Sequence, residues 1–460
     1  MNYLDDTIAA ISTPVGQGGI GIVRLSGAGA LSIADRIFRS RNRRDPSAVP
    51  SRRMLYGHIT DPADDHRVDE VLLSVMHAPK SYTGEDVVEI NCHGGMVSVR
   101  NILELVLRQG ARLAEPGEFT KRAFLRGRID LSQAEAVLDI INAKTEESMK
   151  IASEQLGGRL TERLGELRKK LIEISAFAEA YIDFPEDEIE TASKGEMVKG
   201  LAEARNEISR LSDTFNEARF FRDGLSVAIV GRPNVGKSSL LNTLLSKDRA
   251  IVTDLPGTTR DLIEDYLNIK GLPIRIMDTA GIRNSDEIVE QQGIRRSMQA
   301  IEHADFIIAL FDGSEPHRQE DLDLMDIIKD KKAVVVISKA DLPLRLSVGT
   351  IMADGGPLLS LSTVTGEGVE QLKTAIIESN IHDWKEGHEG LVVTNMRHKT
   401  ALDSAAESLQ RAAGLLSGNE PLELFSIEMR EALNRIGEIT GAITTDDILD
   451  KIFSSFCIGK

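Results

Sequence analysis

The chain has 460 residues, of which 41% are hydrophobic and 28% charged, and its formal net charge is −17. The length predicts roughly three domains, and the composition excludes an intrinsically disordered chain. The negative charge disfavours indiscriminate binding to nucleic acid, although a local basic patch can override that average.

The cysteine content and the N-terminus indicate a cytoplasmic protein. Cys92 and Cys457 are the only cysteines, which excludes a disulfide framework and a zinc site of the CxxC type. The first residues, MNYLDDTIAA, carry acids where a signal peptide needs basic side chains. No apolar run approaches the ~18 residues that a membrane span requires.

The predicted elements change character three times along the chain. Residues 1–118 mix strand-like runs such as IGIVRLSG with the helix-like SVRNILELVLRQG, which predicts an α+β domain. Residues 119–217 are helical in pattern, 218–380 alternate short apolar strands with helices, and 381–460 are helical again. The simplest arrangement is one helical domain built from two chain segments with an α/β domain inserted into it.

Two segments are rich in basic residues. Residues 36–53 concentrate arginines in an expected loop, and residues 121–128 (KRAFLRGR) lie beside an expected helix. Each is either a solvated surface or a contact for a polyanion such as tRNA.

The stretch GRPNVGKS follows the strand-like LSVAIVG directly and precedes the helix-like SSLLNTLLS, as in a phosphate-binding P-loop. Gly231 and Gly236 let the backbone wrap around phosphate oxygens and direct N–H groups at them. Lys237 is expected to reach the β- and γ-phosphates, and Ser238 to bind Mg²⁺.

Motifs further along the chain complete a nucleotide site. In DTAG, Asp278 is expected near the magnesium ion and Gly281 at the γ-phosphate, and PGTTRD supplies Thr259 as a second metal ligand. In SKAD, Asp341 is placed to accept two N–H bonds from guanine, which adenine cannot offer. Ser338 stands where the usual motif has asparagine, which is expected to weaken the base contact, and the residues SLST (360–363) fit the last guanine-contacting loop.

The residue after DTAG is Ile282, which cannot hold the attacking water as the glutamine of Ras-like GTPases does. Asp286, Glu287 and Glu290 follow closely and are candidates for that role, although each is also typical of a solvated helix start.

Together these segments resemble the family of tRNA modification GTPases called MnmE or TrmE. The resemblance covers essentially the whole chain and includes SYTGEDVVEINCHGG, PGEFTKRAFLRGRIDLSQAEAV, VTDLPGTTRD and the terminal FSSFCIGK. It implies an N-terminal folate-binding α+β domain, an all-α helical domain in two segments and an inserted Ras-like G domain.

The resemblance also implies a GTPase activated by K⁺ and by dimerisation of its G domains. The family's water-orienting acid falls on Glu290, so that Glu290, Lys237 and Asn234 become the expected catalytic residues. The implied K⁺ ligands are Asn234, Thr253, Leu255 and Thr258. The implied GTP-binding residues are Asn234, Val235, Gly236, Lys237, Ser238, Ser239, Thr253, Thr258, Thr259, Asp278, Gly281, Lys339, Asp341, Ser362 and Thr363.

For the whole enzyme, the resemblance implies addition of a carboxymethylaminomethyl group to C5 of the wobble uridine (position 34) of certain tRNAs. The implied partner is MnmG (GidA), in a heterotetramer with a homodimer of this chain, and a 5-formyl or methylene tetrahydrofolate supplies the carbon. The implied folate residues are Arg24, Glu89, Arg128 and Lys460. Without the family, Arg24 and Glu89 would be interpreted as a surface ion pair.

One alternative shares the G-domain motifs: a ribosome-assembly, RNA-binding GTPase of the Era or EngA type.

The C-terminal CIGK lacks the aliphatic middle and the usual last residue of a prenylation box, so no membrane anchor is expected. The tail is expected instead to bring Lys460 to the folate site. Cys457 is either a nucleophile near the one-carbon unit or a small buried hydrophobe, and residue type favours the second.

Overall fold

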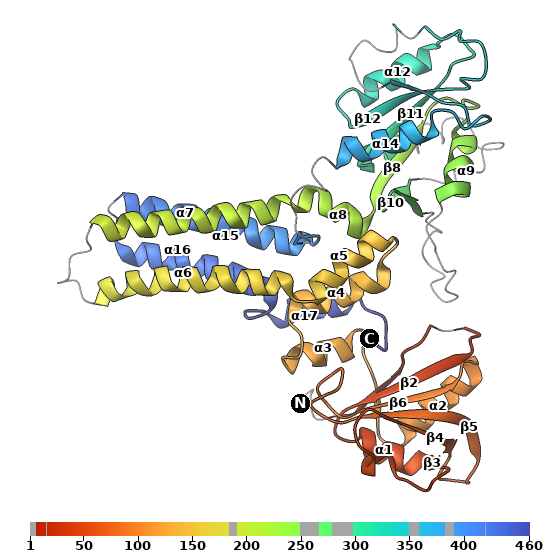
Figure 1. Cartoon of the computed structure of the whole chain (residues 1–460), viewed down its shortest axis with the longest axis vertical. Coiled ribbons are helices and arrows are strands. Elements are labelled where there is room, and N and C mark those ends of the chain that lie inside the picture. Colours follow the sequence, from red (N-terminus) through yellow and green to blue (C-terminus); the bar gives the residue numbers. More distant parts are fainter. Residues whose placement is uncertain are drawn as a thin grey trace.

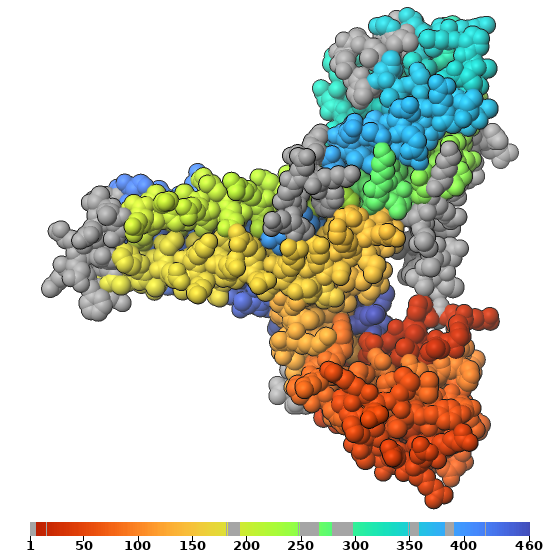
Figure 2. Space-filling view, in the orientation of Figure 1, coloured from red at the N-terminus to blue at the C-terminus, as the bar shows by residue number. Residues whose placement is uncertain are grey.

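The computed structural model describes residues 6–14, 16–183, 191–248, 266–277, 298–347, 349, 358–381, 391–418 and 420–460. Its three parts are an N-terminal α+β domain, a helical domain that includes a long bundle, and an α/β G domain. The bundle extends as an arm, and the other two parts lie on opposite sides of its root (Figures 1 and 2). This layout confirms the predicted fold class.

A seven-stranded sheet forms the N-terminal domain, in the order β3-β4-β5-β6-β2-β1-β7. Buried and less buried residues alternate along β2, because one face packs on the helices α1 (Ala30–Ile37) and α2 (Met96–Arg108). The opposite face carries Arg24 and Glu89. The strands are β1 (Ile8–Ile11), β2 (Ile20–Ser26), β3 (Phe38–Ser40), β4 (Arg53–Thr60), β5 (Arg67–Met76), β6 (Val87–His93) and β7 (Arg112–Leu113).

The helical bundle combines two segments of chain that are separated by the G domain. Buried residues of α15 recur every three or four positions, as in Ala401, Leu402, Ala405 and Leu409, so that one face packs against α7 and α16. No helix of the described residues is both long and apolar enough to cross a membrane. The bundle helices are α6 (Arg159–Asp183), α7 (Thr191–Asp213), α15 (Met396–Ser417) and α16 (Leu422–Thr440).

Shorter helices join the bundle to its neighbours. Asp130 caps α4 and exchanges bonds with Gln133 in a capping box, and Thr145 caps α5. These helices are α3 (Glu118–Leu125), α4 (Leu131–Asn142), α5 (Glu146–Leu156), α8 (Phe215–Asp223) and α17 (Asp446–Phe453).

The G domain has a six-stranded sheet in the order β13-β12-β11-β8-β10-β9, parallel except for β9. All six residues of β8 are buried, as expected for a central strand with both faces covered. Its elements are β8 (Leu225–Val230), α9 (Lys237–Asp248), β9 (Tyr266–Ile269), β10 (Leu272–Ile276), β11 (Phe306–Asp312), α12 (Gln319–Ile328), β12 (Ala333–Ser338), β13 (Leu358–Ser360) and α14 (Val369–Asn380).

Candidate nucleotide and folate sites

The P-loop lies between β8 and α9, at the carboxyl edge of the parallel strands. Gly231 has φ 153°, and a Cβ added there would lie 2.3 Å from the carbonyl oxygen of Leu310. Gly236 has φ 106° and Asn234 has φ 62°. These left-handed backbone angles curl the loop so that its N–H groups and the start of α9 form a cradle for phosphate oxygens.

Lys237 is folded over this loop. Its Nζ donates to the carbonyl oxygens of Gly231 and Arg232, each at 2.7 Å. Burial lowers the pKa of Lys237 to about 8. The carbonyl bonds hold the amine beside the cradle, where a phosphate would favour its charged form.

An ion pair that the sequence did not reveal ties the P-loop to α12. Arg232 Nε donates to Asp321 Oδ1 at 2.7 Å, and Asp321 Oδ2 accepts the backbone N–H of Arg318 at 2.9 Å. Both paired side chains are buried. The pair therefore holds the beginning of the loop against the N-terminus of α12.

The two predicted guanine-binding loops meet at the same edge of the sheet. Ser362 Oγ donates to Asp341 Oδ1 at 2.6 Å, and the N–H of Ala340 donates to the carbonyl of Leu361 at 3.1 Å. Lys339 Nζ donates to Asp312 Oδ2 at 2.5 Å. Asp312, at the end of β11, belongs to none of the nucleotide-binding motifs of the sequence, and its bond orients Lys339.

Ser338 faces the P-loop backbone. Its buried hydroxyl lies 2.6 Å from the carbonyl oxygen of Val235 and 3.0 Å from that of Phe311. The residue at the usual asparagine position thus links the end of β12 to the P-loop.

Several predicted residues lie outside the described part of the chain: Thr253, Leu255, Thr258, Thr259, Asp278, Gly281, Ile282, Asp286, Glu287 and Glu290. Of the predicted metal ligands, Ser238 and Asn234 are described, and both belong to the P-loop. Their side-chain oxygens are the hard ligands that Mg²⁺ and K⁺ prefer. Among the other predicted nucleotide contacts, Ser239 is exposed at the start of α9, and Thr363 follows Ser362 in its loop.

The predicted folate residues Arg24 and Glu89 are cross-strand partners on the outward face of the N-terminal sheet. Arg24 Nε donates to Glu89 Oε1 at 2.8 Å, so the ion pair expected without the family is present. The Arg24 guanidinium also lies 5.7 Å from the ring centroid of Tyr82 and 5.6 Å from that of Phe119. The two rings, which sequence reasoning missed, frame the arginine.

The C-terminal tail reaches this pair from the far end of the chain. The carbonyl oxygen of Gly459 accepts from Arg24 Nη1 at 3.2 Å and from Ser12 Oγ at 3.1 Å. Gly459 has φ 97°, and an added Cβ would lie 2.2 Å from the carbonyl oxygen of Ile11. The N–H of Phe119 donates to the carbonyl of Lys460 at 3.2 Å. The tail is therefore fixed between β1 and α3, and only glycine permits this approach.

Arg128 and Lys460 add positive charge around Tyr82 and Arg24. Arg128 Nη1 donates to the carbonyl of Tyr82 at 2.9 Å, and its guanidinium lies 4.9 Å from the ring centroid. Burial lowers the pKa of Lys460, and the charge of Arg24 lowers it further. Such crowded cations fit an anionic ligand group, as the glutamate tail of a folate would supply.

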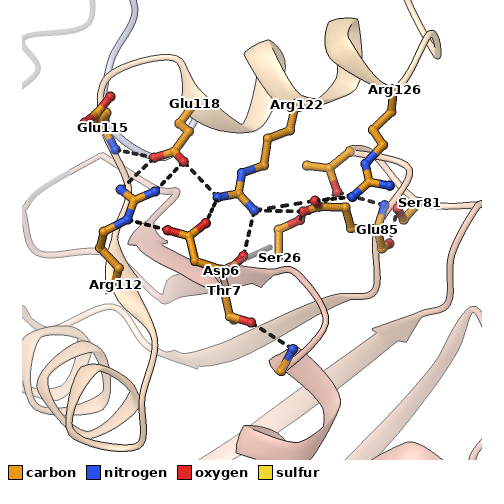
Figure 3. A network of polar contacts seen from close by, with 12 residues as sticks. Asp6, Thr7, Ser26, Ser81, Glu85, Arg112, Glu115, Glu118, Arg122 and Arg126 are labelled. Atoms are coloured by element: carbon orange, nitrogen blue, oxygen red, sulfur yellow. Dashed lines mark hydrogen bonds and ion pairs between the residues drawn. The ribbon is translucent and has the colours of Figure 1, made fainter. Parts of the chain in front are cut away.

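A polar network holds α3 against the N-terminal domain (Figure 3). Arg122, buried on α3, donates to Asp6 at 2.5 Å, to Glu118 at 2.9 Å and to Glu85 at 3.2 Å. Arg112 bonds Glu118 and Asp6, each at 2.7 Å. Because Phe119 belongs to the same helix, the network also fixes the aromatic side of the Arg24 site.

The burial expected for Cys457 from its residue type is wrong. The side chain is exposed, whereas a small buried hydrophobe was favoured. Packing at this end of the chain is supplied by Phe456, which is buried and lies 5.6 Å from the ring centroid of Phe453.

Two family models match most of the chain: "GTP-binding protein TrmE N-terminus" over residues 7–128 and "MnmE helical domain" over residues 131–457. The tRNA modification GTPase MnmE of Alkaliphilus oremlandii is 47% identical over 460 residues and covers 100% of both chains. That of Carboxydothermus hydrogenoformans is 49% identical and covers 99% of this chain and 100% of that protein. The G domain of the T. maritima FeoB iron transporter is 27% identical over 34% of this chain and 98% of that chain, with a TM-score of 0.25. Because the full-length relatives and both family models agree, this chain belongs to the MnmE family of tRNA modification GTPases.

Proposed function

We propose that this protein hydrolyses GTP in the course of tRNA modification. The observation that carries the proposal is the meeting of the P-loop, residues 231–238, with Asp341 and Ser362 at one edge of the G-domain sheet. The full-length relatives named tRNA modification GTPase MnmE support the role in tRNA modification. They disfavour a ribosome-assembly GTPase of the Era or EngA type, because the similarity extends through both flanking domains.

In this proposal Lys237 neutralises the β- and γ-phosphates, and Asp341 accepts N–H bonds from guanine. Glu290 orients the attacking water, since Ile282 at the neighbouring motif has no hydrogen-bonding group. Bound Mg²⁺ and K⁺ would supply positive charge to the phosphates as negative charge develops on them. The proposed ligands are Ser238 and Thr259 for Mg²⁺, and Asn234, Thr253, Leu255 and Thr258 for K⁺.

The potassium assignment has a direct test. GTP turnover should be much faster in KCl than in NaCl at equal ionic strength, and Asn234→Ala should remove the difference. Equal rates in the two salts for the unaltered protein would contradict the assignment.

The role of Glu290 is tested by separating binding from hydrolysis. Glu290→Ala should abolish turnover while a fluorescent GTP analogue still binds, because the water and not the nucleotide loses its partner. Glu287→Ala, a matched change three residues away, should keep activity. Full turnover by the Glu290 variant would mean that another group orients the attacking water.

At the N-terminal domain we propose a site for a tetrahydrofolate derivative, 5-formyl or methylene, that supplies the one-carbon unit. Glu89 would accept from the donors of the pterin edge, while Arg24, Arg128 and Lys460 would hold the anionic tail. The ion pair of Arg24 with Glu89 and the contact with Gly459 support a preorganised site.

The complete reaction in this proposal adds a carboxymethylaminomethyl group to C5 of uridine 34 of certain tRNAs. The protein would act in the cytoplasm as a homodimer that forms a heterotetramer with MnmG (GidA). Deleting the gene from its host and analysing digested tRNA by mass spectrometry tests the proposal. The modified uridine should disappear and return with the intact gene but not with a Lys237→Ala copy, whereas unchanged wobble uridines would falsify the modification role.

A further inference from the structure

The two arginine-rich segments of this acidic chain have different surroundings in the structure. In the segment 121–128, Lys121 pairs with Asp450 at 2.7 Å, and Arg126 pairs with Glu85 at 3.1 Å. Arg122 is buried among carboxylates in the network of Figure 3. This segment is therefore largely neutralised within the molecule.

In the other segment, residues 36–53, Arg36 donates to Gln109 and Arg39 to the carbonyl oxygen of Arg36, but the residues that follow keep their charge unpaired within the described part of the chain. Between β3 and β4, residues 41–53 contain five arginines and one acid, Asp45. All five arginines are exposed, and among the described residues their guanidinium groups have no hydrogen-bond or ion-pair partner. We call this segment the arginine loop; its arginines are Arg41, Arg43, Arg44, Arg52 and Arg53.

The backbone of the arginine loop is held in place by hydrogen bonds, although its guanidinium groups have no partner among the described residues. Its 3-10 turn (Pro46–Ala48) is held by the bond from Ser47 N–H to Asp35 Oδ1 at 2.9 Å. His77 Nε2 lies 2.8 Å from the carbonyl oxygen of Val49, and the N–H of Arg52 donates to the carbonyl of Val75 at 2.7 Å. A loop held in this way presents its cations with little entropy left to lose on binding.

An exposed aromatic side chain lies beside these cations. The N–H of Arg41 donates to the carbonyl of Tyr56 at 3.3 Å, and the Tyr56 side chain is exposed. The register of β3 and β4 places Arg41 directly opposite Tyr56, so these two side chains share a face of the sheet, whereas Arg53, three residues before Tyr56, points to the other face. Arginines that bind phosphates together with a ring that stacks on a base are a combination that suits RNA.

We propose that the arginine loop, with Tyr56, binds the phosphate backbone of the tRNA substrate. The inference rests on the proposed function for the identity of the RNA. β3 and β4 lie at the end of the N-terminal domain that points away from the bundle (Figure 1), so the loop can approach a large ligand. The overall charge of −17 would confine such a ligand to this patch.

An anionic membrane is the main alternative partner for such a surface. A membrane-binding loop presents apolar side chains that enter the lipid between its basic residues. Here the loop's Val49 and Pro46 are buried, and its exposed apolar residues are the small Ala48 and Pro50, with one large exposed apolar side chain, Met54, just after the loop. This composition favours RNA.

The test uses the full-length protein and an unmodified tRNA transcript, with binding measured by fluorescence anisotropy over a range of KCl concentrations. The variant Arg41→Gln/Arg44→Gln/Arg53→Gln removes three charges at positions that have no internal partner and an ordinary φ. Each lost phosphate contact reduces the slope of log K against log[KCl] by about 0.7 to 0.9 in magnitude. The variant should therefore bind about a hundredfold more weakly at ~0.1 M KCl and show a salt slope smaller by about 2.

Two further variants serve as controls. Lys169→Gln/Lys170→Gln/Arg430→Gln removes the same charge from exposed positions of α6 and α16 and should leave binding unchanged. Arg41→Lys/Arg44→Lys/Arg53→Lys keeps the charge and should keep most of the affinity and the salt slope. Equal thermal melting of all variants establishes that the fold is intact.

Equal tRNA binding by the Gln variant and the unaltered protein would overturn the inference. So would a loss of binding that accompanies a change from dimer to monomer in sedimentation, because the arginines would then be contacts between copies of the chain. Binding to vesicles of phosphatidylglycerol and phosphatidylcholine without binding to tRNA would favour the membrane instead. None of these outcomes changes the gene-deletion result, so a failed inference can be told apart from a failed proposed function.

Discussion

At the scale of single residues, the carboxylate of Asp341 is the feature best placed to select the base. Ser362 Oγ donates to one of its oxygens at 2.6 Å, which holds the carboxylate in position and leaves lone pairs for a ligand. Guanine offers two adjacent N–H donors on its edge, whereas adenine does not. In the proposed function, selectivity for guanine depends on this oriented acceptor, which adenine would leave unpaired.

Replacing this acceptor should change which nucleotide binds. Asp341→Asn presents an amide N–H to the exocyclic amine of guanine, so GTP affinity should fall about a hundredfold or more. Xanthine carries a carbonyl at that position, and XTP should bind better than GTP. Competition of GTP, XTP and ATP against a fluorescent nucleotide measures the change.

Ser362→Ala is the matched control for this prediction. It removes the bond that orients Asp341 and keeps the carboxylate, so GTP affinity should fall only about fivefold, with no change in base preference. A switch towards XTP in the Ser362 variant would contradict the role given to Asp341.

At the scale of the elements, Glu135 joins the two chain segments of the helical domain. This buried residue of α4 accepts from Arg397 at 2.8 Å and lies 2.7 Å from His398 Nε2, both on α15. Arg397 in turn donates to the carbonyls of Glu438, at 2.6 Å, and Ile439, at 3.2 Å, near the end of α16. Arg397 thus links the α4 carboxylate to the end of α16, and three helices meet at this ion pair.

This junction should be sensitive to acid. Burial alone would raise the pKa of Glu135, but the charges and hydrogen bonds of His398 and Arg397 outweigh it and hold the pKa at about 2. The folded-state pKa is below the unfolded value, so the stabilisation is complete at neutral pH. It is lost as the pH falls from about 5 to about 2, and it amounts to at most about 3 kcal/mol.

The Glu135→Gln variant tests this stabilisation. Its unfolding midpoint should be lower than that of the unaltered protein at pH 7, and the two should converge as the pH falls towards 2. Glu407→Gln on the exposed face of α15 should have little effect at any pH. A Glu135→Gln deficit that stays constant with pH would mean that packing, and not the charge, stabilises the junction.

At the scale of the whole molecule, the C-terminal tail lies against the N-terminal domain, next to β1 and β2. Gly459 contacts Arg24 and Ser12, while the nucleotide site lies on the other side of the bundle root (Figure 1). The tail is therefore part of the proposed folate site, and within the described part of the chain no hydrogen bond joins it to the P-loop.

Removing Cys457–Lys460 should abolish folate binding while GTP turnover persists. The truncated protein should lose measurable binding of 5-formyltetrahydrofolate in calorimetry, because Arg24 loses the Gly459 carbonyl and the charge of Lys460 is removed. Its GTP turnover should stay within about twofold of the full-length rate, since distant sites contribute independently. Retained folate binding would place the ligand elsewhere.

Cys457→Ser separates the thiol from the tail that carries it. The variant should bind the folate normally, because Cys457 is exposed and its backbone carbonyl, not its side chain, accepts from Gly117 N–H at 3.4 Å. If tRNA modification is lost while GTP turnover and folate binding persist, the thiol has a chemical role.

The sequence by itself determined the features that depend on neighbouring residues. GRPNVGKS indicates a P-loop, because glycines at fixed spacing impose local backbone angles. Alternation in IGIVRLSG and DVVEINCHGG indicates strands with Arg24 and Glu89 on one face, and the helical patterns on both sides of the α/β segment indicate an inserted domain.

Only the tertiary structure decided which distant residues meet. Gly459 lies beside Arg24, and Ser338 faces Val235, because sheet register and helix packing bring them together. The two arginine-rich segments look alike as sequences, yet one is paired with Asp450, Glu85 and its neighbours while the other is exposed. A side chain's charge is a property of its residue type, but its partners depend on how the whole chain packs.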